Sequence, residues 1–338
     1  MDTRTTTPLA ETVRRRYLVT GAAGFIGSHL VEALLERGHQ VVGLDGFVDS
    51  YEREVKVQNL VRALGERRFE FVELDLRTDD LRPWVEDVDV VVNEAAFAGL
   101  PRSWTDVESY VGCNLLAVQR LVVAALEAGV SRFVQASTSS VYGLNAVGDE
   151  RMATEPISPY GISKLAAEQL IQAHVVAHGL PATILRYFSI YGPRQRPDMA
   201  YHIFIERLRR GLPVTVFGDG RQSRSNTFVA DCVAGTLAAV DRGEVGTVYN
   251  IGGGAEIELL DAIAIIADEL GVDPRIEHRP PRPGDQRRTC ADTSRARETF
   301  DYRPTVDPED GLRAQVRWHL ERLPLGSDDS TPPLLVHG

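Results

Sequence analysis

The sequence predicts an α/β protein with a doubly wound parallel sheet and a smaller α/β lobe toward the C-terminus. Short β-branched runs alternate with amphipathic helical stretches from Tyr17 onward, and this alternation produces a parallel sheet covered on both faces. A length of 338 residues permits one large α/β unit or two cooperating lobes. The predicted strands are 17–20, 40–45, 69–74, 88–93, 132–137 and 182–185, and the predicted helices among them are 25–37, 107–128 and 159–178.

After about residue 188 the alternation becomes irregular. Pro- and Arg-rich loops, especially 279–288, separate the predicted elements there, and such loops commonly carry binding groups on a scaffold. The elements predicted in this half are helices 200–210, 259–270 and 308–323 and a strand 213–217. We therefore expect a polar tail (1–16), a first domain (17–187) that the segment around 226–256 could rejoin, a substrate-binding lobe (188–323) and a flexible tail (324–338).

The composition excludes several classes of function. A net charge of -11 leaves no basic surplus for nucleic acid or an acidic membrane. The three cysteines are odd in number and form no CxxC pair, which favours a reduced, cytoplasmic protein without structural zinc. His174 and His178 have helical spacing but no accompanying acidic motif, so we expect a solvated face and no metal site. No apolar run reaches the roughly 18–20 residues of a membrane span, and the N-terminus has no secretory apolar region.

Three glycines lie between the first predicted strand and the first predicted helix. Gly21 allows the tight turn, Gly24 lets the backbone approach a pyrophosphate, and Gly27 permits close packing of the helix on the sheet. The phosphates then lie at the positive end of the helix. This motif in its strand–turn–helix context predicts a Rossmann-type dinucleotide site.

Carboxylates end the next two strands. Asp45, 24 residues after Gly21, can accept hydrogen bonds from the adenosine ribose and would repel a 2′-phosphate, so NAD is predicted in preference to NADP. Asp75, followed by Leu76, ends the third strand and can meet the adenine amino group.

Tyr160 and Lys164 open a predicted helix and lie on one helix face, because they are four residues apart. A tyrosine with a pKa of about 10 is a poor base at neutral pH. A neighbouring ammonium and a cationic nicotinamide ring favour the phenolate and lower that pKa. Lys56 and Lys164 are the only lysines in a chain whose other basic side chains are arginine, so the position of Lys164 is informative.

Residues 137–143, Ser-Thr-Ser-Ser-Val-Tyr-Gly, follow a strand, so their hydroxyls face the ligand crevice. With the glycine motif, Asp45 and the Tyr160/Lys164 pair, they make residues 17–323 resemble the extended short-chain dehydrogenase/reductase family of nucleotide-sugar enzymes. The resemblance implies that Thr138 assists Tyr160, the base, and that Lys164 is its partner. The further NAD contacts that it implies are Phe25, Ile26, Ala95, Ala96, Asn114 and Tyr187.

The residues after Thr138 divide that family by reaction. Its 4,6-dehydratases carry an Asp-Glu pair there and its glucuronate decarboxylases usually a glutamate, whereas this chain has Ser139 and Ser140. Without an acid at these positions elimination is disfavoured, and epimerisation remains. Residues 192–200 resemble UDP-glucuronate 4-epimerases, in which the arginine matching Arg196 binds the substrate carboxylate; Arg194 could compete for this role.

The same resemblance implies contacts to the UDP group and the sugar. The implied substrate contacts are Thr138, Ser139, Ser140, Ser189, Arg196, Thr215, Phe217, Arg224, Arg282 and Asp285. The chain departs from the family where the usual His-Leu-Ala-Ala becomes Asn93-Glu94-Ala95-Ala96, where residues 98–104 replace Ala-Gly-Val-Arg-x-Ser-Trp, and at residues 224–231. These departures put fine substrate contacts in doubt.

The predicted function is NAD-dependent C4 epimerisation of a UDP-sugar, with UDP-glucuronate as the favoured substrate, UDP-galacturonate as the product and a 4-keto intermediate. The alternatives are a UDP-glucose/galactose 4-epimerase, a net oxidoreductase acting on a keto sugar, and a catalytically silent NAD-binding sensor protein. In the family, helices corresponding to 107–128 and 159–178 pair across a two-fold axis, which implies a homodimer. The alternative is that these helices only cover the sheet.

Overall fold

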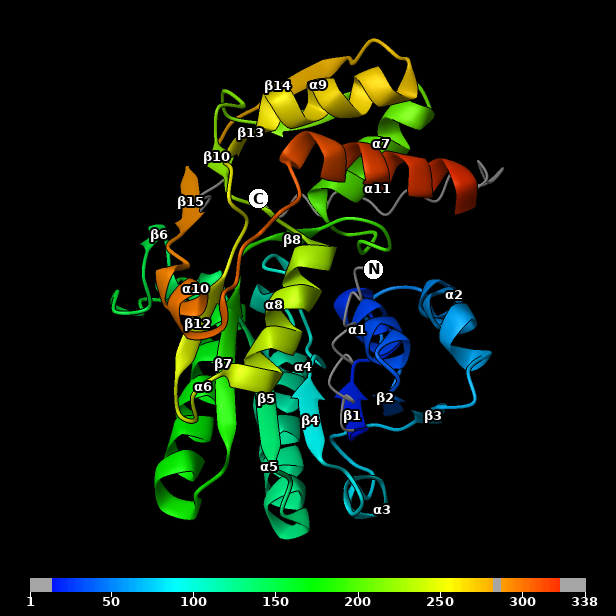
Figure 1. Cartoon of the computed structure of the whole chain (residues 1–338). Coiled ribbons are helices and arrows are strands. Elements are labelled where there is room, and N and C mark those ends of the chain that lie inside the picture. Colours follow the sequence, from blue (N-terminus) through cyan, green and yellow to red (C-terminus); the bar gives the residue numbers. More distant parts are fainter. Residues whose placement is uncertain (1–13, 282–286, 323–338) are drawn as a thin grey trace, which may run out of the picture.

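The computed structural model describes residues 14–281 and 287–322, with only the backbone of Arg322. Most of the predicted N-terminal tail, the predicted C-terminal tail 324–338 and the predicted substrate residues Arg282 and Asp285 lie outside the described residues. The described chain forms a large sheet with helices on both faces, and a smaller lobe that adjoins the sheet at one end (Figure 1).

The central sheet has seven strands in the order β12-β7-β5-β4-β1-β2-β3. All of its strand pairs are parallel, so the predicted doubly wound fold is confirmed. The chain first runs outward through β2 and β3 and then returns to place β4 on the other side of β1, so the strand order reverses between β1 and β4. A ligand crevice is expected at the carboxyl ends of the strands on either side of such a reversal. The strands are β1 (Arg16–Thr20), β2 (Gln40–Asp45), β3 (Phe69–Glu73), β4 (Val90–Asn93), β5 (Arg132–Thr138), β7 (Ala182–Tyr187) and β12 (Val248–Ile251).

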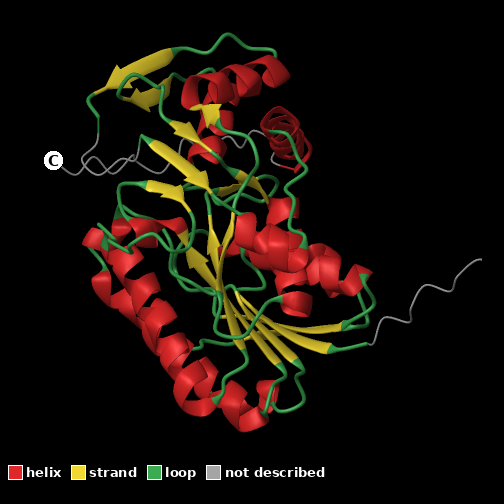
Figure 2. Ribbon diagram, turned by 60° about the vertical axis from the view of Figure 1, so that its left-hand side comes forward, coloured by secondary structure: helices red, strands yellow, loops and turns green. Residues whose placement is uncertain are grey.

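Helices cover both faces of this sheet (Figure 2). One face carries α1 (Phe25–Glu36), α2 (Arg53–Leu64), α8 (Val229–Arg242) and α10 (Ser294–Phe300), and the other carries α3 (Arg82–Val85), α5 (Ala117–Ala128) and α6 (Pro159–His178). Strand β4 shows why both faces are buried: Val90 and Val92 pack into the first core, whereas Val91 packs into the second. Helices α2, α8 and α10 were not predicted from the sequence.

The helix predicted over residues 107–128 is continuous but contains a π turn. It consists of α4 (Val107–Val111), the π-helical η2 (Gly112–Leu116) and α5. By length and composition alone it could cross a membrane, contrary to the expectation that no segment would. In the structure it packs on the sheet beside α6, and the core helix of a soluble protein passes the same test.

The smaller lobe has its own apolar core between α7 (Ala200–Arg209), α9 (Leu259–Leu270) and α11 (Pro308–Arg322). Strand β9 (Val214–Phe217) pairs in parallel with β14 (Ile276–Arg279) beside these helices. A four-stranded sheet joins the lobe to the central sheet, in the order β13 (Ile257–Glu258), β10 (Ser223–Arg224), β15 (Arg288–Ala291) and β6 (Ala146–Gly148). The short pair β8 (Ile190–Tyr191) and β11 (Thr227–Phe228) lies between the lobe and α8, and β12 then pairs with β7.

Candidate active site

A cleft with about 1200 Å³ of open space lies at the carboxyl ends of the central strands. Most of the predicted cofactor residues and the predicted catalytic pair line it, although they come from elements far apart in the sequence. The predicted residues in its wall are Gly21, Gly24, Phe25, Ile26, Gly27, Asp45, Asp75, Leu76, Ala95, Ala96, Tyr160, Lys164, Tyr187 and Arg196. The structure therefore brings the cofactor motif and the Tyr160/Lys164 pair to a single pocket.

The glycine turn has the geometry of a phosphate cradle. Gly21 has a φ of +65°, and a Cβ atom there would lie 2.9 Å from the amide nitrogen of Ala95. A Cβ on Gly27 would overlap the carbonyl oxygen of Gly21. Helix α1 begins directly after Gly24, so its amino end faces the cleft. The turn thus requires glycine at two positions and fits the pyrophosphate of a dinucleotide.

Asp45 ends β2 with its carboxylate turned into the cleft wall. It accepts hydrogen bonds from the backbone N–H groups of Ala23 (3.2 Å) and Phe47 (2.9 Å). Burial raises the pKa of Asp45, and the Lys56 ammonium, whose Nζ lies 3.9 Å from Oδ1, opposes this rise. Lys56 also lines the cleft, and sequence analysis gave it no role although it is one of two lysines. The arrangement fits an adenosine ribose beside Asp45.

Two other predicted cofactor residues have partners within the protein. The carboxylate of Asp75 pairs with Arg77, 2.7 Å away, which lowers the pKa of Asp75. Asn114 lies in the π turn and is fully buried; its carboxamide bonds both backbone polar groups of Phe97 and the hydroxyl of Ser163. Because it is not among the residues that line the cleft, the structure does not support a direct Asn114–cofactor contact; Asn114 instead joins the β4 loop to α6.

Tyr160 and Lys164 occupy the first turns of α6. Ser158 caps this helix by accepting a hydrogen bond from the backbone N–H of Gly161 (3.1 Å), and Pro159 is well suited to the first turn. The Nζ atom of Lys164 donates to the carbonyl oxygen of Ala136, 2.7 Å away at the end of β5. Burial lowers the pKa of Lys164 to about 8, and the carboxylates of Glu94 and Glu168 oppose this fall.

The pKa of Tyr160 is raised by burial. A hydrogen bond with Thr138 and the nearby Arg196 guanidinium oppose the rise. An acidifying influence of Lys164 was predicted from the sequence, and the structure adds those of Thr138 and Arg196. Thr138 lies at the end of β5, where its hydroxyl also accepts from the Ser140 backbone N–H (3.2 Å). Ser139 and Ser140 belong to the turn that follows.

The structure discriminates between the two candidate carboxylate-binding arginines. Arg194 is buried against α1, where it donates to Glu32 (2.7 Å) and Ser28 (3.2 Å), and so faces away from the cleft. Arg196 lines the cleft and forms a bidentate pair with Asp198 through Nε (2.9 Å) and Nη2 (3.0 Å). Of these two arginines, Arg196 is the one available to a ligand in this pocket.

A second pocket lies in the smaller lobe beside the Arg196 loop. Its wall includes the predicted substrate residues Ser189 and Arg224, but not Thr215 or Phe217. The backbone of Phe217 is nevertheless adjacent, because its carbonyl accepts from the side chain of Gln222, which does line this pocket. Residues 192–200 contribute to both pockets, so one loop joins them.

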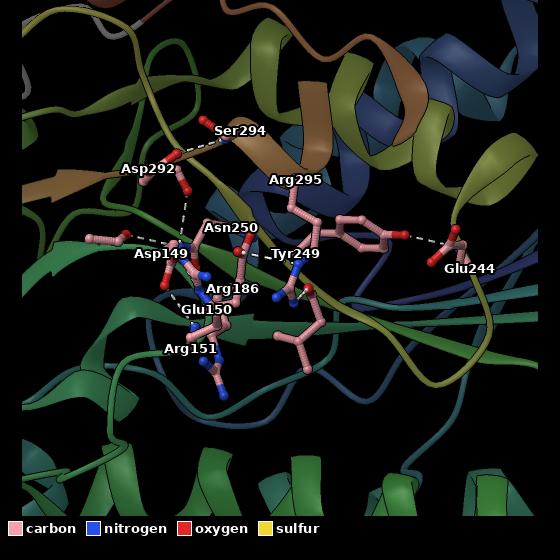
Figure 3. Close-up of polar contacts among 12 residues, drawn as sticks. Asp149, Glu150, Arg151, Arg186, Glu244, Tyr249, Asn250, Asp292, Ser294 and Arg295 are labelled. Atoms are coloured by element: carbon pink, nitrogen blue, oxygen red, sulfur yellow. Dashed lines mark hydrogen bonds and ion pairs between the residues drawn. The ribbon is translucent and has the colours of Figure 1, made fainter. Parts of the chain in front are cut away.

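A buried polar network supports the cleft from behind. Ser137, in the cleft wall, donates to Glu168, and Glu168 forms a bidentate pair with Arg186. Arg186 donates to the Tyr142 hydroxyl (2.9 Å), which in turn donates to Asn250 (2.8 Å). Figure 3 shows the far end of this network, where Arg186 lies near Asn250 and Glu150. The network links β5, α6, β7 and β12 to one another near Lys164.

Glu94 is a further ionisable residue in the cleft, and sequence analysis noted it only as a departure from the family pattern. It follows β4 directly and accepts a hydrogen bond from the Tyr187 hydroxyl, 2.7 Å away. Burial raises the pKa of Glu94 to about 7. Its hydrogen-bond partner lies 93 residues away in the sequence, so no local motif could have identified it.

The chain matches known proteins along most of its length. The model of the NAD dependent epimerase/dehydratase family matches residues 17–252. The chain is 40% identical over 307 residues to the uncharacterized UDP-glucose epimerase YtcB of Bacillus subtilis, covering 90% of this chain and 97% of that protein. It is 37% identical over 305 residues to a dTDP-glucose 4,6-dehydratase of Streptomyces griseus, covering 89% and 93%.

A solved structure is also similar. The UDP-glucuronic acid 4-epimerase of Bacillus cereus, in complex with UDP-glucuronic acid and NAD, superposes with a TM-score of 0.88 at 39% identity and covers 90% of this chain and 99% of its own. The family match covers more than half of the chain and includes the glycine turn, Asp45 and the Tyr160/Lys164 pair. The chain therefore belongs to the NAD-dependent epimerase/dehydratase family and is an NAD-dependent enzyme of this class.

Proposed function

We propose that the protein epimerises UDP-glucuronate at C4 to UDP-galacturonate, with Tyr160 as the base. The observation that carries the proposal is that Arg196 and Tyr160 line the same pocket, while serines 139 and 140 stand where dehydratases and decarboxylases carry an acid. A guanidinium is the natural partner of a sugar carboxylate. The similarity to UDP-glucuronic acid 4-epimerase supports the same substrate.

The residues divide the chemistry between them. When bound, NAD supplies the hydride acceptor and donor for C4. Tyr160 takes the proton of the C4 hydroxyl and returns it after the sugar has turned over, while Thr138 holds the phenol by a hydrogen bond. Lys164 and Arg196 supply positive charge beside the phenolate, which makes proton removal easier. No net oxidation occurs, because a 4-keto sugar forms and is reduced again.

The keto sugar must present its opposite face while its UDP group stays fixed. Arg224 and Ser189, in the wall of the neighbouring pocket, are suited to hold the diphosphate and the sugar-proximal part of the ligand. With glucuronate the intermediate is a β-keto acid that could lose carbon dioxide. A carboxylate bound to Arg196 and to Thr138 or Ser139 keeps its negative charge on its own oxygens. Its bond to the sugar ring is then not aligned for loss of carbon dioxide.

A UDP-glucose/galactose 4-epimerase is the second candidate. It is favoured by the bidentate pair between Arg196 and Asp198, because that guanidinium already has a carboxylate partner. A glucuronate substrate has to share or displace Asp198, whereas a neutral hexose does not. A net oxidoreductase would use the same three residues but would need free exchange of NADH, whereas a catalytically silent NAD-binding sensor does not explain why Thr138, Tyr160 and Lys164 are all present.

The protein is further proposed to act as a homodimer in the cytoplasm. Apolar side chains are exposed on the two adjacent helices that cover one face of the sheet, including Leu116 (57% exposed), Ile162 (56%) and Val176 (86%). Their burial against a second copy is favourable. The three cysteines are unpaired, which is consistent with a reducing compartment.

The proposal is tested by supplying UDP-glucuronate and UDP-glucose separately and identifying each product by mass and NMR. We expect UDP-galacturonate of unchanged mass, formed with a higher kcat/KM than UDP-galactose from UDP-glucose. Conversion of the neutral sugar alone would favour the second candidate. Retention of NAD with no conversion of either sugar would favour the silent sensor.

A further inference from the structure

Glu94 occupies a position in the cleft that the proposed mechanism does not use. Asn93 pairs with Gln135 in the β4–β5 register, so Glu94, the next residue, lies level with Ala136. The carbonyl of Ala136 is the group that accepts the Lys164 ammonium. The carboxyl group therefore lies at the strand end where the catalytic lysine is held.

The side chain of Glu94 projects from the apolar face of the sheet. Because side chains alternate along a strand, Glu94 points to the same side as Val90 and Val92, which pack in the core with Tyr187 and Cys232. On this face the charged form of a carboxyl group is poorly solvated, which is why its pKa rises to about 7. Tyr187 and Lys164 are described groups that favour the charged form.

The titratable and charged groups facing Glu94 come from three elements. Tyr187 of β7 donates to the carboxyl group, Cys232 of α8 interacts with it electrostatically, and Lys164 of α6 is the cation that favours the carboxylate. Among these three residues Lys164 supplies the positive charge. Glu168 flanks the same ammonium, but its carboxylate already makes a bidentate pair with Arg186.

A hydroxyl chain can accommodate Glu94 in either charge state. The Tyr187 oxygen lies 2.7 Å from Glu94 and 2.8 Å from the Thr236 hydroxyl, which donates to the Cys232 carbonyl. A charged Glu94 accepts from Tyr187, and a neutral Glu94 can donate to Tyr187, which then donates to Thr236. The site thus permits loss and gain of a proton at Glu94 without leaving a buried group unpaired.

We propose that Glu94 is a positioning residue whose carboxylate keeps the Lys164 ammonium charged and held at the floor of the catalytic cleft. Lys164 is buried, so without a counter-charge it would lose its proton at a lower pH. A neutral Lys164 no longer supplies positive charge to the reacting centre. The role rests on the proposed function, because it matters for catalysis only if Tyr160 and Lys164 form the catalytic pair.

The scarcity of lysine permits a direct test. Protein labelled with ¹³C at the lysine ε carbon gives signals from two residues only, and Lys56→Arg identifies the Lys164 signal. We expect the Lys164 signal of the NAD-loaded wild-type protein to titrate with a midpoint that falls by about 1 pH unit in Glu94→Gln. This substitution keeps the shape of the side chain and an oxygen that can accept from Tyr187.

Glu70→Gln is the matched control, because it removes the same charge from an exposed position on β3, at the far edge of the sheet. Its Lys164 midpoint should equal that of wild type. The alkaline limb of kcat/KM should fall by the same amount as the midpoint in Glu94→Gln, since activity requires the charged lysine. A merely structural role for Glu94 would lower kcat without moving that limb.

Equal Lys164 midpoints in wild type and Glu94→Gln would overturn the proposal. If Glu94→Gln does not fold, the wild-type titration decides alone: the Lys164 signal should show an additional step near pH 7 from Glu94, and a single step would contradict the role. A protein inactive on every UDP-sugar would refute the proposed function but would leave this titration readable.

Discussion

At the scale of single residues, the proposed reaction depends on the hydroxyl of Tyr160. Replacing it with Phe removes the proton acceptor but preserves the ring, which packs edge-on against Tyr110 at 6.1 Å. We expect Tyr160→Phe to lower kcat by about 10²–10⁴-fold, the usual contribution of a positioned acid–base group. Bound NAD, measured after denaturing the purified protein, should remain near the wild-type amount. Wild-type turnover in this variant would remove Tyr160 from the mechanism.

Arg196 is proposed to select the sugar in the same pocket. Arg196→Lys keeps the positive charge but cannot form the two parallel hydrogen bonds that a guanidinium makes to a carboxylate. We expect kcat/KM for UDP-glucuronate to fall about 10–100-fold, equivalent to one charge-assisted hydrogen bond, while that for UDP-glucose changes little. An equal loss on both sugars, measured in parallel assays, would mean that Arg196 acts on Tyr160 alone.

At the scale of secondary-structure elements, the turn between β1 and α1 sets the cofactor site. A Cβ on Gly27 would overlap the Gly21 carbonyl, whereas Gly129, which ends α5 with a φ of +69°, has open space around it. Gly27→Ala should abolish NAD binding, measured by calorimetry. Gly129→Ala should cost about 1–2 kcal/mol of unfolding free energy and leave NAD affinity unchanged. If Gly27→Ala bound NAD with unchanged affinity, the proposal that the glycine turn binds the pyrophosphate would be contradicted.

The elements predictable from sequence are those with strong local signals. The strand before Gly21 and the helix that contains Tyr160 and Lys164 follow from their periodicity, and both are observed. Helix α8 was missed because it follows an irregular, Arg-rich stretch that hides its period. The π turn at Gly112–Leu116 has no sequence signature. The family resemblance implied a cofactor contact for Asn114, whose hydrogen-bond partners in the structure lie inside the protein.

The site was predictable to the same extent. Motifs at fixed spacing identified Gly21, Asp45 and Tyr160, because the strand or helix of each residue's own segment sets its position. Glu94 and Lys56 were recognisable only as a departure and an unusual lysine. Their roles depend on which side chains the fold brings beside them, Tyr187 and Asp45, and a single sequence does not reveal such pairs.

At the scale of the whole molecule, the exposed apolar residues of α4, η2, α5 and α6 predict a dimer. Introducing Leu116→Glu and Ile162→Glu together should halve the mass measured by analytical ultracentrifugation, because two buried charges per subunit would oppose association. Val61→Glu, a substitution of a 55% exposed residue on α2 at the opposite face, is the matched control and should leave the mass unchanged. A monomeric wild-type protein would contradict this prediction.

The reaction is proposed to occur by reversible oxidation at C4 with one cofactor bound in the cleft, and the fate of the C4 hydrogen tests this most directly. UDP-glucuronate deuterated at C4 should give UDP-galacturonate that retains the deuterium at C4, because the same hydride leaves and returns within a single bound cofactor. Mass spectrometry and NMR of the product measure this. Product that has lost the label, or carries hydrogen from solvent at C4, would contradict the account.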